Sequence, residues 1–153
     1  MRQKILNCIT EDLLTVPPLL FRSMRSKMLK DALATSKLNL TPLLLEIMKL
    51  LDEQGTLQVT EIGHKLHIAR PQITRMIDKL IGLGMVKRQS GTVDRRTINI
   101  ALSAKGKKSL KENDIHIRQV IGEFLSEFTD EDLQDLSDSL RKLRDVFSKI
   151  TYD

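Results

Sequence analysis

The sequence predicts a mainly α-helical protein with one small β-hairpin, and three observations lead to this fold class. Most of the 153 residues fall in stretches whose apolar side chains recur every three or four positions, the period of an amphipathic helix. One segment past the middle alternates apolar and polar residues instead, as half-buried strands do. Threonine, proline and glycine stand where helices would begin and end. The elements therefore follow the order helix, helix, helix–turn–helix, hairpin, helix, helix.

The N-terminal part of the chain predicts two helices. A loose apolar stripe covers residues 5–33, but the prolines at 17–18 must start, break or kink a helix there, because proline lacks a backbone N–H and clashes with the preceding turn. The second helix is better marked, with Thr41 as a natural N-cap and Pro42 at the first helical position. Gly55 is the expected end of this helix.

A pair of helices is predicted next. Residues 59–66 form a short amphipathic helix, and a tight turn leads to a second helix from Arg70 to Leu83, which ends at Gly84. The second helix turns one apolar side towards the core, and this side consists of Ile73, Ile77 and Leu80.

The alternating segment follows this helix pair directly. "MVKRQ" and "TINIALS" predict two antiparallel strands with one buried face, joined by the polar and basic tip "SGTVDRR". A helix pair followed by such a hairpin is the order of a winged helix-turn-helix, whose second helix lies in the DNA major groove. The apolar residues that fit the buried face are Val86, Ile98, Ile100 and Leu102.

Two more helices are predicted after the hairpin. The first starts in "SAKGKKSLKEN" and continues through Phe128. The second is capped by Thr129. Acidic residues in its first turn interact favourably with the positive end of the helix dipole. Its apolar residues alternate by three and four, as in a coiled-coil seam, so we expect this helix to pack against a partner. The seam consists of Leu133, Leu136, Leu140, Leu143, Phe147 and Ile150.

Positive charge is concentrated in the middle of the chain, although the whole sequence carries only +5. Residues 64–111 hold 12 basic and 2 acidic residues, whereas residues 112–153 hold 5 basic and 11 acidic residues. This asymmetry points to a polyanion that binds the middle region. Aromatic residues make up 3% with no tryptophan, which argues against a stacking surface for single-stranded nucleic acid.

The outer side of the helix that begins at Arg70 carries side chains suited to DNA. Gln72 and Arg75 can form bidentate hydrogen bonds with base edges, and the methyl group of Thr74 can meet a thymine methyl. Arg70 and Lys79 are better placed for phosphates. The simpler alternative is a solvated helix face, but the helix spacing and the local charge favour DNA contact. The candidate DNA-binding residues of this helix are Arg70, Pro71, Gln72, Thr74, Arg75 and Lys79.

The tip of the hairpin predicts a second DNA contact. Arg95 and Arg96 follow Asp94 in the turn between the strands. An arginine at such a tip can enter a narrow, A·T-rich minor groove, where the negative potential is enhanced. Asp94 could hold one guanidinium by a bidentate pair. The alternative is a surface ion pair that contributes little.

These motifs resemble the MarR family of bacterial and archaeal transcription regulators. The resemblance lies in "IARPQITRMIDKLIGLGMVKR" and "DRRTINIALSAKG", and it covers residues 38–106 by motif. It implies a homodimer with interlocked terminal helices that binds a pseudo-palindromic operator on double-stranded DNA, usually as a repressor. The residues that match the family's wing pattern, D-x-R-x-x-x-(V/I/L)-x-L-(T/S), are Asp94, Arg96, Ile100, Leu102 and Ser103.

The resemblance also divides the chain into three parts. Residues 1–36 are expected to be an N-terminal dimerisation region, residues 37–103 the winged helix-turn-helix that binds DNA, and residues 104–153 the C-terminal dimerisation helices.

Three positions depart from the usual family pattern. Gln58 stands where a threonine or serine often caps the helix, and His67 replaces the usual glycine of the turn, where a positive φ is costly for histidine. Ala69 stands where a serine commonly caps the recognition helix, so a capping bond worth about 1 kcal/mol is expected to be missing.

Regulators of this family often respond to small ligands, oxidants or metals. By resemblance, a small-molecule effector would bind between the dimerisation helices and the winged domain, near Phe21, Met24 and Met28, although such residues are more often plain core. Cys8 is the candidate for a redox-responsive regulator, but it lacks activating neighbours, and a buried or frayed N-terminal cysteine is the simpler interpretation.

Other classes of function have less support in the sequence. His64 and His67 could share a helix face, but no nearby carboxylate or thiol completes a metal site. No glycine-rich phosphate loop or nucleophile–histidine pair indicates an enzyme, and no cofactor is expected. With one cysteine and no apolar run long enough for a membrane helix, the chain is expected in the cytoplasm. A winged helix used only for protein contacts remains the alternative to DNA binding.

Overall fold

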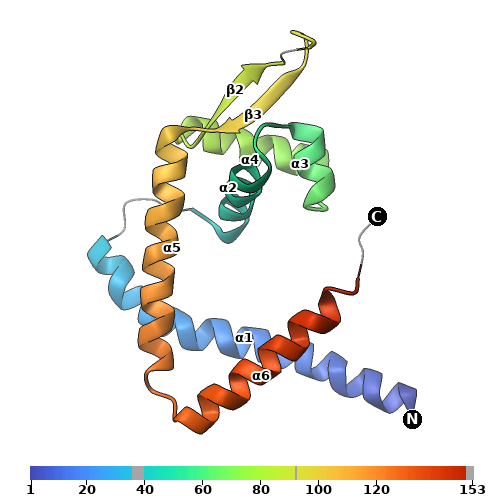
Figure 1. Ribbon diagram of the computed structural model, residues 1–153, viewed down its shortest axis with the longest axis vertical. Coiled ribbons are helices and arrows are strands. Elements are labelled where there is room, and N and C mark those ends of the chain that lie inside the picture. Colours follow the sequence, from blue (N-terminus) through green and yellow to red (C-terminus); the bar gives the residue numbers. More distant parts are fainter. Residues whose placement is uncertain (36–39, 92, 151–153) are drawn as a thin grey trace. The chain divides into compact units, whose positions relative to one another are not determined.

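The computed structural model describes residues 1–35, 40–91 and 93–150, and it describes no side chains over residues 27–35. Helices dominate, and the one sheet is small, which confirms the predicted fold class (Figure 1). The chain separates into two compact units, one formed by Met1–Thr35 with Ile117–Asp153 and the other by Ser36–His116. Each unit is described by itself.

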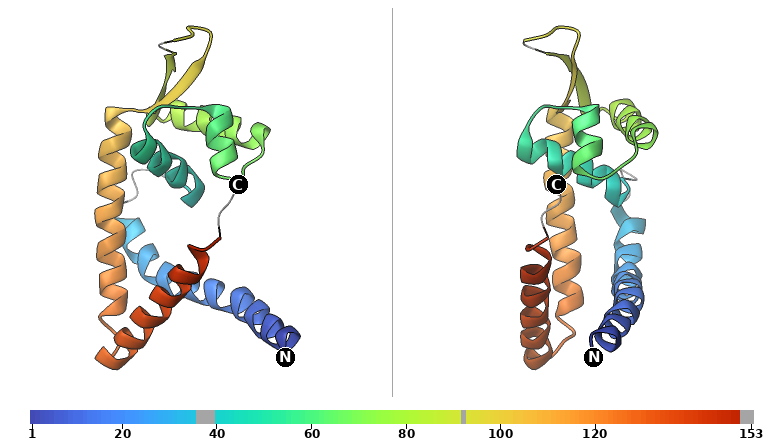
Figure 2. Two further views of the ribbon diagram at one scale, coloured as in Figure 1. Left: turned by 45° about the vertical axis from the view of Figure 1, so that its right-hand side comes forward. Right: turned by 90° about the vertical axis from the view of Figure 1, so that its right-hand side faces the viewer.

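The unit Ser36–His116 contains the predicted helix pair and hairpin. Its elements are α2 (Pro42–Gln54), β1 (Leu57–Gln58), α3 (Val59–Lys65), α4 (Arg70–Gly82), β2 (Val86–Ser90), β3 (Ile98–Leu102) and the first half of α5 (Ala104–Leu125). Seen from two sides, the β2–β3 hairpin projects away from the helices of this unit (Figure 2).

The predicted ends of α2 are confirmed. Thr41 takes the N-cap position and its hydroxyl oxygen accepts a hydrogen bond from the backbone N–H of Leu44 at 3.5 Å, while Pro42 starts the helix. Gly55 ends the helix with a φ of 80°, a conformation that glycine adopts without strain.

The three predicted departures lie at the start of α3 and in the turn between α3 and α4. Gln58 is the N-cap of α3, and the carboxylate of Glu61 accepts a hydrogen bond from its backbone N–H at 2.8 Å. His67 has a φ of 53°, as expected for a position that favours glycine. Ala69 is the N-cap of α4 and offers no side-chain hydrogen bond. The backbone approaches α3 closely in this turn, so a Cβ atom at Gly63 would lie 3.0 Å from the carbonyl oxygen of Ile68.

A three-stranded antiparallel sheet has the strand order β1-β3-β2. The hairpin was predicted, and its register pairs Val86 with Leu102 and Ser90 with Ile98. The placement of Ile98 on the buried face is wrong, because its side chain is 55% exposed. The third strand, β1, was not predicted. It has only two residues, too few for an alternating pattern, and it exists because Leu57 pairs with Ile100 more than forty positions further along the chain.

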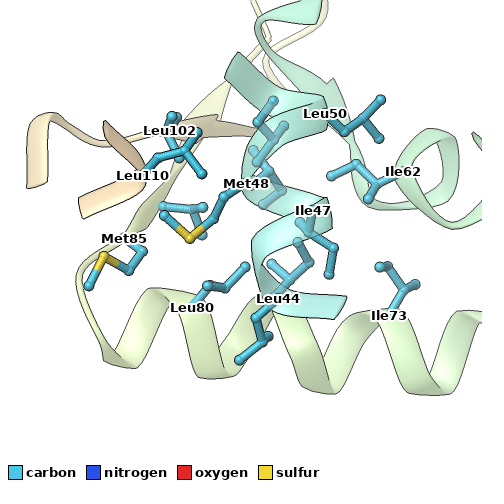
Figure 3. Packing of buried hydrophobic residues seen from close by; sticks show 14 residues of the cluster. Leu44, Ile47, Met48, Leu50, Ile62, Ile73, Leu80, Met85, Leu102 and Leu110 are labelled. Atoms are coloured by element: carbon cyan, nitrogen blue, oxygen red, sulfur yellow. The ribbon is translucent and has the colours of Figure 1, made fainter. Parts of the chain in front are cut away.

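The core of this unit forms around α2. Figure 3 shows Leu44, Ile47 and Met48 of α2 between α4 below and the sheet with the start of α5 above. Each of these three side chains is at most 1% exposed. The core therefore ties α4 to a rigid support, which fixes the orientation of its outer face. The other members of the cluster are Leu50, Leu51, Ile62, Ile73, Ile77, Leu80, Met85, Val86, Ile100, Leu102 and Leu110.

Hydrogen bonds fasten the start of α5 to the end of α4. The hydroxyl of Ser103 lies 2.6 Å from the carbonyl oxygen of Gly84 and accepts a bond from the N–H of Gly106 at 2.9 Å. The ammonium of Lys105 donates to the carbonyl of Leu83 at 2.8 Å. A side chain at Gly106 would collide with the backbone of Met85, so this junction requires glycine.

The other unit contains α1 (Arg2–Thr35), the second half of α5 and α6 (Asp130–Phe147). Of the outcomes predicted at Pro17 and Pro18, a start or a break of the helix is wrong, because α1 continues through both prolines; a kink stays a prediction. The carbonyls of Leu13 and Leu14, which lose their N–H donors, belong to exposed residues and can be hydrated.

The C-terminal helices start as predicted but end earlier. Thr129 caps α6, and its hydroxyl accepts a hydrogen bond from the N–H of Asp132 at 3.1 Å. The prediction that the helix before it continues through Phe128 is wrong: α5 ends at Leu125, and the ring of Phe128 packs edge-to-face on Phe124 with centroids 5.2 Å apart. Ile150 lies beyond the end of α6.

Candidate nucleic-acid interface

The outer face of α4 consists of exposed polar side chains. Ile73, Ile77 and Leu80 are at most 1% exposed and anchor the helix in the core, as predicted. The opposite side is therefore held outwards by packing rather than by its own interactions. The six candidate residues of this helix, Arg70, Pro71, Gln72, Thr74, Arg75 and Lys79, are all exposed.

Two of these side chains also bind their own helix. The hydroxyl of Thr74 donates to the carbonyl of Arg70 at 2.8 Å, so its methyl group is the part left free for a partner. The Nε atom of Arg75 donates to the carbonyl of Pro71 at 3.3 Å. This bond holds the stem of Arg75 against the helix and leaves its two terminal nitrogens available as a bidentate donor.

The two flanks of the outer face differ in charge. On one flank, an open groove of about 450 Å³ separates α4 from the N-terminus of α2. On the other flank, Asp78 forms an ion pair with Arg88 of β2, with 2.7 Å between the carboxylate and guanidinium. The groove is lined by Thr41, Leu44, Gln72, Arg75, Met76 and Lys79.

The sequence analysis did not single out Arg88. The signal available was Asp78, an acidic residue on an outer face otherwise suited to DNA. The partner lies on a strand ten residues further along the chain, and the pairing depends on how β2 packs beside α4. Because Arg88 neutralises Asp78, the carboxylate does not oppose a polyanion on this flank.

The hairpin tip is organised by backbone hydrogen bonds. The carboxylate of Asp94 accepts from the backbone N–H of Arg96 at 2.9 Å, and the carbonyl of Asp94 accepts from the N–H of Thr97 at 3.1 Å. The predicted pairing of Asp94 with an arginine guanidinium is absent from the described contacts, because the carboxylate is engaged by the turn backbone instead. Gly91 closes the tip, where a side chain would collide with the carbonyl of Asp94.

Both wing arginines are accessible to a partner. Arg95 and Arg96 are exposed, as is Asp94. The neighbouring Val93 is fully exposed as well. The tip therefore offers two cations and one apolar side chain to a partner, on a hairpin that projects from the helices (Figure 2).

The seam predicted on α6 is exposed or half-buried, and α6 has no buried residue. Leu133 is half-buried, Leu140 is 53% exposed and Leu143 is 49% exposed. The apolar side chains of α1, among them Ile9, Leu13 and Leu20, are also exposed. Leu136, Phe147 and Ile150 complete the exposed seam.

The structure gives little support to the predicted redox and effector sites. Cys8 is exposed on α1. Phe21 is exposed and Met24 is half-buried, whereas the side chain of Met28 lies outside the described residues. Among the residues that the structure describes, no three histidine, cysteine, aspartate or glutamate side chains come together as metal ligands. No described helix is long and apolar enough to cross a bilayer.

Comparison with known proteins agrees with this geometry. Residues 40–98 match the sequence model of the MarR family. The chain is 27% identical to the HTH-type transcriptional repressor MdtR of Bacillus subtilis over 114 residues, which are 74% of this chain and 72% of that protein. It is 41% identical to the HTH-type transcriptional regulator PapX of Escherichia coli over 56 residues, 37% of this chain and 34% of that protein.

Solved structures share the fold. A MarR family protein from Bacillus stearothermophilus superposes with a TM-score of 0.70 at 22% identity, over 97% of this chain and 99% of that one. RV1404 from Mycobacterium tuberculosis gives a TM-score of 0.75 at 20% identity, over 97% of both chains. The named relatives are transcriptional regulators and not enzymes, as predicted. The winged helix-turn-helix of this chain belongs to the MarR family.

Proposed function

We propose that this protein is a sequence-specific transcriptional regulator that binds double-stranded DNA as a homodimer and represses its target from a pseudo-palindromic operator. The observation that carries the proposal is the outer face of α4, where polar and cationic side chains are held outwards by a buried apolar side. The family of its winged helix-turn-helix consists of DNA-binding regulators.

The three parts of the chain then have separate roles. Residues 37–103 bind DNA, and residues 1–36 and 104–153 supply the helices of the dimer. The exposed apolar side chains of α1 and α6 support this assignment, because a surface of this kind needs a partner in water. A second copy of the chain offers the same surface, as a two-fold dimer requires.

Within the DNA-binding part, Gln72, Thr74 and Arg75 read base edges in the major groove. Arg70 and Lys79 hold phosphates. The wing carries Arg95 and Arg96 into the adjacent minor groove, where Asp94 keeps the turn closed. The net positive charge of residues 64–111 supports this placement of the DNA.

Repression and release complete the proposal. The repressor role is supported by the similarity to MdtR, which is described as a repressor. A small-molecule effector would release the DNA in the cytoplasm, and the redox-responsive alternative through Cys8 has only the exposure of that thiol in its favour.

Fluorescence anisotropy with DNA from the promoter upstream of the protein's own gene tests the proposal. The wild-type protein and Arg75→Ala are titrated at two salt concentrations, with a scrambled duplex as the control. We expect the wild type to prefer the promoter and to bind less tightly as salt rises. Arg75→Ala should lose about 1–3 kcal/mol of that preference.

Two other outcomes of this titration would contradict the proposal. Equal weak binding to both duplexes contradicts a sequence-reading role at that promoter and favours a winged helix used for protein contacts. Absence of binding at low salt contradicts DNA binding by the ligand-free protein.

A further inference from the structure

The groove between α2 and α4 is built from two elements that the core holds rigidly. Thr41 and Leu44 come from the first turn of α2, and Gln72, Arg75 and Lys79 come from α4. Leu44 is 1% exposed and anchors α2 in the core. The two helices that carry the polar groups of the groove are therefore fixed relative to each other by buried packing.

Each polar side chain that lines the groove can donate hydrogen bonds, and the lining includes no carboxylate. Lys79 and Arg75 contribute positive charge, and Gln72 contributes amide N–H groups. The hydroxyl of Thr41 accepts from the N–H of Leu44, and its own O–H can still donate. A compact anion with several oxygens matches such a lining.

The opposite flank of α4 differs because it carries a carboxylate. There, Asp78 forms an ion pair with Arg88 at 2.7 Å. The flank that faces the N-terminus of α2 has two cations, Arg75 and Lys79, and no carboxylate in the groove lining. A phosphate of a DNA backbone beside α4 is therefore attracted more strongly to this flank than to the flank of the ion pair.

We infer that the groove seats one phosphate group of the DNA backbone at the edge of the major groove that α4 enters, with Lys79 and Thr41 as its ligands. This inference rests on the proposed DNA-binding function. A phosphate held there fixes the position of α4 along the duplex, because Gln72 and Arg75 belong to the same groove wall. Thr41 thereby becomes a DNA-positioning residue on a helix outside the helix–turn–helix.

The salt dependence of DNA binding tests the role of Lys79. The full-length protein, Lys79→Ala and the control Lys49→Ala are titrated with the promoter and scrambled duplexes from low to high salt. Lys49 is exposed on the same helix as Thr41, eight residues further along and about 12 Å away along the axis. Both substitutions remove one charge from an exposed helix position.

Lys79→Ala should weaken binding to both duplexes about ten-fold at low salt, since a hydrogen bond to a charged group is lost without loss of base reading. The slope of log K against log salt should become shallower by about 0.9 for each protomer whose α2–α4 groove holds a phosphate. Lys49→Ala should keep the wild-type slope. If Lys79→Ala also keeps that slope while the wild type binds DNA, the phosphate seat and the phosphate contact of Lys79 are both wrong, whereas DNA binding by the protein stands.

A pair of substitutions at Thr41 tests the other side of the groove. Asparagine and aspartate are both good N-caps, so Thr41→Asn and Thr41→Asp should keep the thermal stability of α2. Only aspartate places a negative charge in the groove. We expect Thr41→Asp to weaken DNA binding at least about ten-fold more than Thr41→Asn, from repulsion of the phosphate. Equal effects of the two variants would overturn the inference.

A free anion has the same chemistry as a backbone phosphate, so its binding is measured directly. Inorganic phosphate is titrated into the DNA-free protein at constant ionic strength, and the backbone amide signals of Thr41, Leu43 and Leu44 are followed by NMR. Saturating shifts that Lys79→Ala abolishes, together with an unchanged salt slope of that variant on DNA, would assign the groove to a free anion and contradict the DNA seat. Failure of the wild type to bind any duplex overturns both this inference and the proposed function.

Discussion

The two units of this chain use their apolar residues in opposite ways. Among the described residues, every buried apolar side chain except Val120 lies in the unit Ser36–His116. In the other unit, α6 has no buried residue and α1 exposes a series of large apolar side chains. The difference shows that the unit with α4 completes its own core, whereas the unit with α1 and α6 leaves large apolar side chains exposed, as the proposed dimer interface requires.

This comparison separates two kinds of stability. The first unit should depend on intramolecular packing and should respond to core substitutions at any protein concentration. The second should depend on association and should respond to concentration. The following four predictions test that separation.

The largest expected effect is in the core of the unit Ser36–His116. Ile47→Ala should lower the free energy of unfolding by about 3 kcal/mol, because Ile47 is 0% exposed and its loss leaves a cavity at the centre of α2. Urea denaturation followed by circular dichroism measures the change. A loss below about 1 kcal/mol would mean that this site collapses around the smaller side chain and that the core is less rigid than its burial indicates.

The next effect concerns the seam of α6. Leu140→Asp should weaken self-association by at least about 2 kcal/mol, because a charge would replace an apolar side chain at the centre of the proposed interface. Sedimentation velocity over a range of concentrations measures it. Ser139→Asp is the control, since Ser139 is exposed and lies next to the seam but outside it. Equal association of both variants would remove α6 from the interface.

A smaller effect is expected at the start of α4. Ala69→Ser should raise the free energy of unfolding by about 1 kcal/mol, since the N-cap of α4 has no side-chain hydrogen bond and serine can supply one. Thermal unfolding at a fixed protein concentration measures the gain. Ala69→Val cannot cap and serves as the control. A gain with valine equal to that with serine would show that the cap is not its cause.

The smallest effect is expected in the turn before α4. His67→Gly should raise the free energy of unfolding by about 0.5 kcal/mol, because relief of the strained φ of 53° exceeds the added entropy of the unfolded chain. His64→Gly is the matched control within α3 and should lower stability. If His67→Gly lowers stability instead, the interactions of the histidine side chain outweigh the backbone strain.

Features with a local cause were predictable from the sequence. The start of α2 at Thr41 and its end at Gly55 follow from a few adjacent residues, whereas the positive φ of His67 was implied by the family resemblance. The inward side of α4 also followed from helical period alone. The DNA-contact roles assigned to its outer face and to the wing stay predictions for the experiments above.

Features that depend on distant partners were missed or wrong. The strand at Leu57 exists through its pairing with Ile100, and Arg88 matters because β2 places it beside Asp78. A start or a break of the helix at Pro17 was wrong, because exposure lets the affected carbonyls be hydrated, and the predicted kink is untested.

The sequence alone determined the order of the elements, the helix caps and the side of α4 that faces inwards, because these depend on backbone preference and on the period of apolar residues within one segment. The tertiary structure alone decided the ion pair at Asp78 and the groove between Thr41 and Lys79. Both bring together side chains from separate elements, and only the packing of the core around α2 sets the distance between those elements.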